Sequence, residues 1–148
     1  MDIIRMGCDM DFRLATPADC TALHQLDTFA AEHPERVEAI AAWISEGTCH
    51  VAAIGGELAA YGALSNHFFG AAFIEMLVVG SDFRRQGVGS ALVGHLQKSR
   101  SGSKLFTSTN MSNHSMQKLL LKAGFKPSGY IDNLDENDPE LVFFHPNP

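Results

Sequence analysis

The stretch DFRRQGVGSAL, residues 82–92, places two arginines and two glycines between an apolar run and an amphipathic one. Gly87 and Gly89 lack a β-carbon, so a ligand can approach their backbone closely. A helix that starts at this point presents unpaired N–H groups and partial positive charge. The arginine pair and the glutamine beside it add donors. The stretch is therefore a candidate oxyanion site, and alternatively a tight strand-to-helix turn with surface arginines.

Strands and helices are predicted to alternate on both sides of this stretch. The run AFIEMLVV, residues 72–79, is typical of a central strand covered on both faces. Residues 88–100 have the apolar spacing of an amphipathic helix. The other predicted elements are, in chain order, a strand (11–16), two helices (16–30 and 33–47), a hairpin (49–64), a strand (104–110), a helix (112–125) and two strands (129–132 and 140–145). This order predicts a mixed α/β fold with one sheet and helices on both faces.

Length and composition indicate a single domain over residues 1–148, with 45% apolar and 19% charged residues. No apolar run reaches the roughly 18 residues that span a bilayer, and the N-terminal residues lack the apolar stretch of a secretory signal. We therefore expect a cytoplasmic protein without a membrane partner. The net charge of −6, with 11 Lys and Arg, argues against a nucleic-acid partner. The three cysteines and seven histidines show no metal-ligand spacing, so no metal is predicted.

Two common phosphate motifs do not fit the glycine-containing stretch. A P-loop requires Lys and then Ser or Thr at its end, whereas Ser90 and Ala91 follow the second glycine. A dinucleotide fingerprint requires a third small residue where this chain has Leu92. A nucleotide-binding protein of another class is therefore the less favoured alternative.

The segment LVVGSDFRRQGVGSAL resembles the acetyl-CoA-binding segment of the GNAT (Gcn5-related) N-acetyltransferases. The family pattern is Arg or Gln, two residues, Gly, one residue, then Gly or Ala, and here it is met by Arg84, Gly87 and Gly89. The later segment STNMSNHSMQKLLLKAGF resembles a second family landmark, an asparagine before a helix that ends in Gly-Phe. With the strand order, the resemblance spans residues 11–145. It implies the GNAT acyl-CoA N-acyltransferase fold, a mostly antiparallel sheet of about seven strands.

The resemblance also implies acetyl-CoA as the cofactor, with coenzyme A as the product. The cofactor's diphosphate would lie on the loop formed by Arg84, Arg85, Gln86, Gly87, Val88, Gly89 and Ser90. Its pantetheine arm would pair with the fourth strand, beside a bulge, along Leu77, Val78 and Val79. An amide near Val78 would polarise the thioester carbonyl.

Two asparagines are candidate cofactor contacts on the same basis. Asn113 matches the family's asparagine, and Asn110 is a second candidate. Either residue can instead be only a helix cap or a turn residue.

The implied reaction is direct transfer of the acetyl group to a primary amine, which must first lose a proton to a base. Glu75 is the one acid in FIEMLVV and the candidate base; alternatively it faces solvent or satisfies a buried donor. The family often has a tyrosine as the acid where this chain has Leu120. Ser115, Tyr130 or a water can replace it, or the thiolate leaves with little help. The missing tyrosine also supports an alternative function, a non-catalytic acyl-CoA-binding module.

The acceptor is expected to enter between the first two helices and the last loop, where acidic residues are dense. These acids are Asp27, Glu32, Asp132, Asp135, Glu136, Asp138 and Glu140. Their density favours a cationic amine on a small molecule or peptide, and the alternative is a solvated loop built from turn-forming residues. Because many relatives dimerise, the resemblance is also compatible with a homodimer.

Overall fold

The chain folds around a seven-stranded sheet with the strand order β1-β2-β3-β4-β5-β7-β6. The computed structural model of the chain describes residues 10–100, 102 and 104–146. Every neighbouring pair of strands is antiparallel except β4 and β5, which are parallel. The strands are β1 (Met10–Leu14), β2 (Cys49–Ile54), β3 (Glu57–Phe68), β4 (Ala71–Val79), β5 (Leu105–Asn110), β6 (Lys126–Ile131) and β7 (Glu140–His145).

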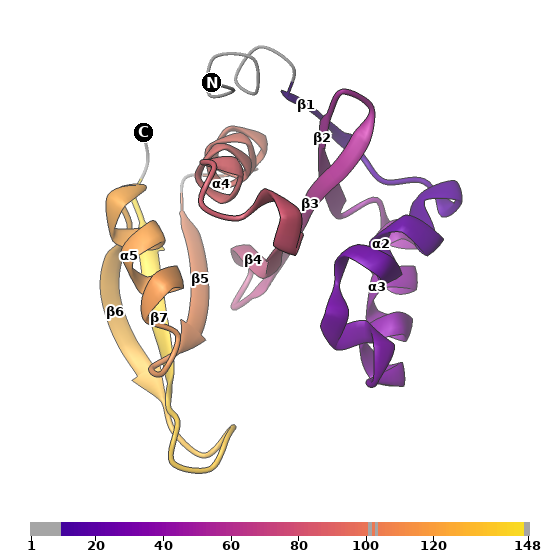
Figure 1. Cartoon of the computed structure of the whole chain (residues 1–148). Coiled ribbons are helices and arrows are strands. Elements are labelled where there is room, and N and C mark those ends of the chain that lie inside the picture. The colour runs from indigo at the N-terminus through magenta and orange to yellow at the C-terminus, as the bar shows by residue number, and fades with distance from the viewer. Residues whose placement is uncertain (1–9, 101, 103, 147–148) are drawn as a thin grey trace.

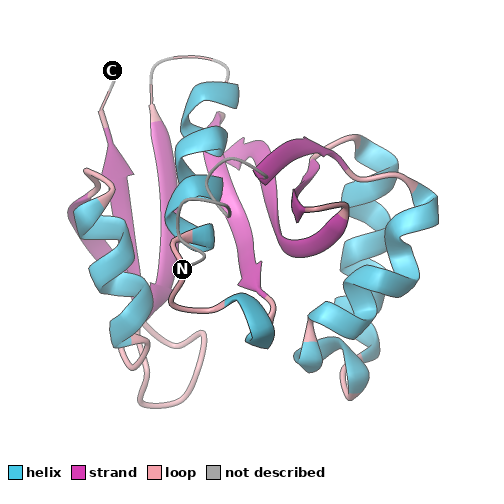
Figure 2. Ribbon diagram, turned by 45° about the horizontal axis from the view of Figure 1, so that its top comes forward, coloured by secondary structure: helices cyan, strands magenta, loops and turns pink. Residues whose placement is uncertain are grey.

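Helices cover both faces of the sheet (Figure 1), as the sequence predicted. On one face α4 and α5 pack through buried side chains such as Leu92 and Leu120. On the other face α2 and α3 pack through Leu23 and Ile40. Figure 2 shows these two pairs of helices well apart, with strands between them. Burying each of these side chains contributes about 1.5–3 kcal/mol. The helices are α2 (Cys20–Leu26), α3 (Pro34–Glu46), α4 (Val88–Ser99) and α5 (His114–Lys122), with short 3-10 helices η1 (Pro17–Asp19), η2 (Thr28–Ala31) and η3 (Ser81–Phe83).

The first helical segment starts at a charged cap. The Asp19 carboxylate accepts a 2.7 Å hydrogen bond from the Thr16 backbone N–H. It also pairs with Arg13 at 2.8 Å. The hydrogen bond from Arg13 is the main reason that the pKa of Asp19 falls to about 2. These contacts fix the connection from β1 into η1 and α2.

Most predicted elements have somewhat different bounds in the structure. The helix predicted over 16–30 ends at Leu26, because Asp27 leaves the helical conformation and its carboxylate accepts a hydrogen bond from the Phe29 N–H. Strand β3 extends past the predicted hairpin to Phe68, and β6 begins at Lys126, three residues before the prediction. Backbone pairing with β4 and β7 lengthens these two strands.

A β-bulge interrupts the pairing of β3 with β4. Ala63 lies opposite Met76 and Leu64 lies opposite Ile74, so Glu75 is the extra residue on β4. A bulge bends its strand and increases the local twist. The bulge implied by the family resemblance is therefore at Glu75.

The sheet parts immediately beyond this bulge. Parallel pairing between β4 and β5 covers only Ala72 to Ile74 on β4 and Leu105 to Thr107 on β5. The rest of β4, through Val79, continues without β5 beside it. The edge of β4 that would face β5 is thus left without a strand partner and can pair with another extended chain.

Candidate active site

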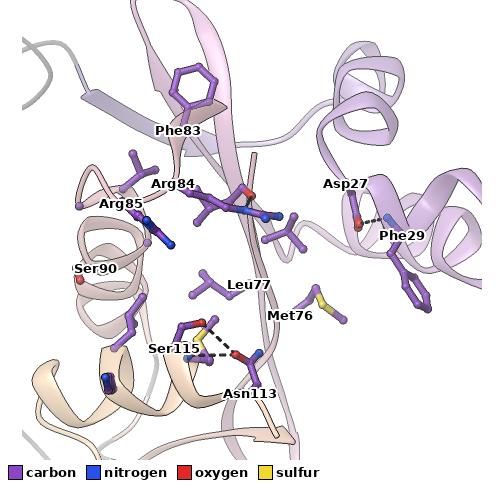
Figure 3. Close-up of a pocket in the computed structure, with 18 of the residues that line it drawn as sticks. Asp27, Phe29, Met76, Leu77, Phe83, Arg84, Arg85, Ser90, Asn113 and Ser115 are labelled. Atoms are coloured by element: carbon purple, nitrogen blue, oxygen red, sulfur yellow. Dashed lines mark hydrogen bonds between the residues drawn. The ribbon is translucent and has the colours of Figure 1, made fainter. Parts of the chain in front are cut away.

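A cavity of about 800 Å³ opens where β4 and β5 part (Figure 3). Its walls come from η2, α3, β4, the loop before α4, the first turn of α4, and the length of α5. A second cavity of about 300 Å³ lies between the parting strands. The larger volume is in the range of small-molecule and cofactor sites. The residues that line both cavities are Arg36, Met76, Leu77, Asn113 and Met116.

The loop between β4 and α4 has a left-handed backbone conformation at its first glycine. Gly87 caps α4 with φ 82°, and a β-carbon there would point into open space. Arg85 also has a positive φ, of 62°, which costs a residue other than glycine roughly 1–2 kcal/mol. Such strain persists where the surroundings hold it, commonly at ligand sites. The sequence did not indicate the strain at Arg85.

Side chains of this loop also brace it from within. Arg84 Nε donates to the Val79 carbonyl at 3.2 Å, and Gln86 Nε2 donates to the Asp82 carbonyl at 3.1 Å. Arg84 and Arg85 line the larger cavity, and so do Val88 and Ser90. Gln86 lines neither cavity, so its position supports the loop and not a ligand directly.

Glycine is required at position 89 for a different structural reason than at position 87. A β-carbon at Gly89 would lie 2.9 Å from Leu119 Cδ1 and 3.4 Å from Val79 Cγ2. Gly89 therefore lets α4 pack closely against α5 and β4, and all three residues line the larger cavity. A side chain there would displace the floor of the cavity. Gly89 would therefore contribute to a ligand site through close helix packing as well as through access to its backbone.

The larger cavity is strongly basic although the chain is acidic. Five of the 11 Lys and Arg line it, whereas Asp27 is its one acidic lining residue among the described residues. Such a concentration of one charge sign attracts an anion. The five residues are Arg36, Arg84, Arg85, Lys118 and Lys122.

The backbone of β4 forms the centre of the cavity wall. Leu77, Val78 and Val79, for which the family resemblance implied a place beside a cofactor arm, are half-buried and line the larger cavity. They lie on the stretch of β4 that has no β5 partner. Their side chains also pack against the two cores, so the same residues stabilise the fold and shape the cavity.

The two candidate asparagines have different surroundings. Asn113 caps α5, where its Oδ1 accepts hydrogen bonds of 3.2 Å from the Met116 N–H and from Ser115 Oγ (Figure 3). Within the described residues its amide nitrogen makes no hydrogen bond, and Asn113 lines both cavities. Asn110 Nδ2 instead donates to Asp135 Oδ2 at 2.9 Å. Asn110 lines only the smaller cavity.

The candidate base Glu75 projects from the bulge into the smaller cavity. Its Oε1 accepts a 3.4 Å hydrogen bond from Trp43 Nε1, so it does satisfy a donor, and it is half-buried. Of the candidate acids, Ser115 lines the larger cavity. Tyr130 is 64% exposed on β6 and lines neither cavity. Leu120 is buried and lines the smaller one.

Asp27 is a buried partner of other side chains. It is 2% exposed and accepts hydrogen bonds from Tyr61 OH at 2.5 Å, from Arg36 Nη1 at 2.7 Å and from the Phe29 N–H at 3.1 Å. Burial, together with the Asp27 carboxylate, raises the pKa of the Tyr61 phenol, which stays protonated. The sequence offered Asp27 only as an acid near the acceptor, and it gave no sign of Tyr61 or Arg36.

Several acids of the last loop also have protein partners. Asp138 accepts hydrogen bonds from the Ser112 N–H and hydroxyl, at 3.0 and 2.7 Å. Glu140 accepts one of 2.7 Å from Ser108 Oγ and lines the smaller cavity. The other acids of the acceptor region are exposed and line neither cavity; they are Glu32, Asp132, Asp135 and Glu136.

Three further observations concern metal ligands, membrane-spanning helices and the Cys49 thiol. Across residues 10–100, 102 and 104–146, no three His, Cys, Asp or Glu side chains come together to hold a metal ion. No helix in that same part of the chain is both long and apolar enough to cross a bilayer. Burial raises the pKa of the Cys49 thiol to about 12, so this residue is not a nucleophile at neutral pH.

Comparisons with known proteins agree with the fold. A model of the acetyltransferase (GNAT) family matches residues 18–125. A GNAT-family acetyltransferase from Bacillus cereus ATCC 10987 superimposes with a TM-score of 0.87 at 29% identity, covering 94% of this chain and 98% of that one. The ribosomal-protein-S18-alanine N-acetyltransferase of Escherichia coli gives 0.75 at 19% identity, covering 93% and 94%. yncA from Salmonella typhimurium, determined with acetyl-CoA, gives 0.72 at 15% identity, also covering 93% and 94%. No curated protein matches the sequence.

Proposed function

The chain belongs to the acetyltransferase (GNAT) family, and from that premise we propose that it transfers an acetyl group from acetyl-CoA to a primary amine. One observation carries this proposal. The basic loop at the start of α4 and the stretch of β4 that has no β5 partner line the same cavity. The first feature suits a diphosphate and the second suits an extended amide-containing arm. We also propose that residues 1–148 form one domain.

The residues present fit acetyl-CoA. The side chains of Arg84, Arg85, Lys118 and Lys122 would neutralise its phosphates, with help from the amides that begin α4. Leu77, Val78 and Val79 would offer backbone groups to the pantetheine arm. The amide nitrogen of Asn113 is a further donor on the wall of the cavity. When bound, acetyl-CoA supplies the acetyl group as a reactive thioester.

Glu75 is the residue best placed to take a proton from the acceptor. An alkylammonium has a pKa of about 10, so it must be deprotonated before its nitrogen can attack. Glu75 lies on the wall of the smaller cavity, where the amine would approach the parting strands, and Trp43 holds one of its oxygens at 3.4 Å. In this role Glu75 accepts the proton, and Trp43 is a positioning residue.

Ser115 is the proposed proton donor for the departing thiolate. It lines the larger cavity beside Asn113, to which its hydroxyl is hydrogen-bonded. The demand on such a donor is modest, because a thiol with a pKa near 8.5 is a fair leaving group. The burial of Leu120, in the place of the tyrosine that the family resemblance implied, supports a second candidate function: binding of acyl-CoA without catalysis.

The proposal is tested by thiol release from acetyl-CoA over a panel of primary amines. Amine-dependent release supports acetyl transfer. Tight binding of acetyl-CoA with no release over the whole panel supports the non-catalytic alternative.

A further inference from the structure

One guanidinium in the larger cavity lies apart from the basic loop. Arg84 and Arg85 lie on one side of the cavity, and Asp27 and Phe29 lie on the other (Figure 3). Arg36 belongs to the second group, because its Nη1 is 2.7 Å from Asp27 Oδ2. Its guanidinium carbon also lies 4.4 Å from the centre of the Phe29 ring. The phosphates of acetyl-CoA have four other cations on the loop and α5, so Arg36 is not needed for them.

Arg36 is held rigidly and still has donors to offer. Its partner Asp27 is fixed by the Tyr61 hydroxyl and the Phe29 N–H, and the Phe29 ring supports the guanidinium from one side. Within the described residues the Arg36 side chain donates one hydrogen bond, from Nη1 to Asp27, so most of the five N–H groups of the guanidinium are uncommitted. The side chain is 16% exposed, and it lines both cavities. A guanidinium in this state is suited to a carboxylate.

The smaller cavity has a charge of the opposite sign at Glu75. Arg36 and Glu75 line the same space of about 300 Å³. Its other carboxylate, Glu140, is hydrogen-bonded to Ser108. A space of this size, with one guanidinium and two carboxylates in its wall, one of them held by Ser108, suits a small molecule that carries both charges.

We propose that the acceptor is a small amino acid-like compound, a primary amine with a carboxylate, in which Arg36 binds the carboxylate and Glu75 receives the ammonium group. This rests on the proposed acetyl transfer and narrows its substrate class. The sequence favoured a cationic amine because acids are dense in the acceptor region, yet most of those acids have protein partners or lie outside the cavities. An acceptor that needs only Glu75 for its ammonium group is compatible with both observations. Arg36 is then the residue that determines specificity for the carboxylate.

The transfer is balanced in atoms and charge. The amine nitrogen forms a bond to the acetyl carbon while the carbon–sulfur bond breaks. Two of the three ammonium protons leave: one reaches solvent through Glu75, and the other is balanced by protonation of the thiolate. The products are an N-acetylated amino acid and coenzyme A.

The test compares each acceptor with its own carboxamide, which removes the negative charge and keeps the size. The probes are β-alanine and the protein amino acids that carry a primary amine (all except proline), each paired with its primary amide, and the measurement is kcat/KM by thiol release. An amine next to an amide has a pKa of about 7.7–8.0, so more of it is deprotonated at neutral pH and its intrinsic reactivity favours the amide. We expect the wild-type protein to prefer the acid of its best pair by at least about tenfold.

Variants separate recognition from folding. Arg36→Gln should lower kcat/KM for the acid at least about tenfold, mainly through KM, and leave the amide within about twofold. Arg36→Lys, which keeps the charge without the planar fork, should retain part of the preference. Asp27→Asn is the matched control: it weakens the anchor of Arg36 and leaves the guanidinium, so the preference should persist.

Three outcomes would overturn the inference: equal use of acid and amide by the wild-type protein, an equal loss of both in Arg36→Gln, or acetylation of other amines with no amino acid accepted. If no amine is acetylated, acetyl transfer fails and calorimetry decides the inference separately. In that case, the protein with coenzyme A should bind the N-acetyl amino acid of at least one pair more tightly than the corresponding N-acetyl amide, and equal or absent binding would overturn it.

Discussion

The hydroxyl of Thr107 on β5 donates a 2.9 Å hydrogen bond to the carbonyl of Ile74 on β4, and these two residues are the last pair that joins the strands. The bulge at Glu75 follows immediately. The bond therefore closes the sheet on one side of this point, and the cavities open on the other. The position of the bulge determines both where the cleft begins and where the candidate base projects.

Removing the basic residues of α5 should weaken acetyl-CoA binding. We expect Lys118→Ala combined with Lys122→Ala to raise the Kd about fivefold to thirtyfold, because two cations on the cavity wall are lost. Lys104→Ala combined with Lys126→Ala removes the same charge from exposed positions outside both cavities and should change the Kd less than twofold. Calorimetry measures the Kd of both double variants. An equal loss of acetyl-CoA affinity in the two would show that the effect comes from net charge alone.

Replacing Gly87 should weaken acetyl-CoA binding in addition to the loss of stability that its positive φ angle predicts. Gly56, in the turn between β2 and β3, has nearly the same φ (84° against 82°), and both glycines have open space where a β-carbon would point. Replacing either with alanine should cost about 1 kcal/mol of unfolding free energy. Only Gly87→Ala should also lower acetyl-CoA affinity. Urea unfolding and calorimetry test this pair, and an equal effect on affinity would contradict the role of the loop.

Glu75→Gln should slow turnover without weakening the cofactor. A general base contributes about 10²-fold to 10⁴-fold, so we expect kcat to fall at least about a hundredfold at an unchanged Kd for acetyl-CoA. Glu140→Gln is the control, because this second carboxylate lines the same cavity but is held by Ser108. Steady-state kinetics gives the answer; comparable activity of Glu75→Gln and the wild type would remove Glu75 from the mechanism.

The hydroxyl of Tyr61 should stabilise the fold. Tyr61 is fully buried and donates to the buried Asp27 carboxylate. Tyr61→Phe leaves that carboxylate with one donor fewer, which we expect to lower the unfolding free energy by about 1–3 kcal/mol. Tyr130→Phe, at a side chain that is 64% exposed, should have almost no effect in the same urea titration. An unfolding free energy of Tyr61→Phe equal to that of the wild type would show that the Asp27 carboxylate does not need the Tyr61 hydroxyl while it is paired with Arg36.

Stability should fall in mild acid because of a histidine pair. His50 Nδ1 and His95 Nε2 are 3.0 Å apart, and burial is the main cause that lowers the pKa of each below 6.5. Protonation then favours the unfolded chain, so the stabilising contribution of the neutral pair is lost as the pH falls from about 6.5 through the lowered values. His50→Gln should flatten the dependence of urea midpoints on pH between 7.5 and 5.5, whereas His67→Gln, at an exposed position, should not. An unchanged slope in His50→Gln would contradict this assignment.

Local patterns predicted most of the fold. Every predicted strand is present, because alternation and apolar runs depend on near neighbours in the sequence. The helix predicted over 16–30 was too long, because its end is fixed by the side chain of Asp27, whose partners Arg36 and Tyr61 lie 9 and 34 residues away. No periodic pattern reports such contacts.

The basic loop was predictable and the acceptor side was not. The glycines and arginines of the loop lie close together in the sequence, so their spacing alone indicated a candidate anion site, with a tight strand-to-helix turn as the alternative. Arg36 reads as an ordinary exposed position of an amphipathic helix, and only the packing of η2 against α3 places it on the cavity wall. In the same way, the sequence showed that the last loop is rich in acids, but it gave no sign that Ser108 and Ser112 are hydrogen-bonded to two of them.

Calorimetric titration of acetyl-CoA into the wild-type protein tests the central claim most directly, because the whole site is built around a basic loop beside a parted sheet. The proposal predicts saturable binding of one molecule per chain, weakened as sodium chloride is raised from 50 to 300 mM, since the cations of the loop and α5 would neutralise the phosphates of acetyl-CoA. Absence of binding at low salt, or binding that salt leaves unchanged, would contradict it.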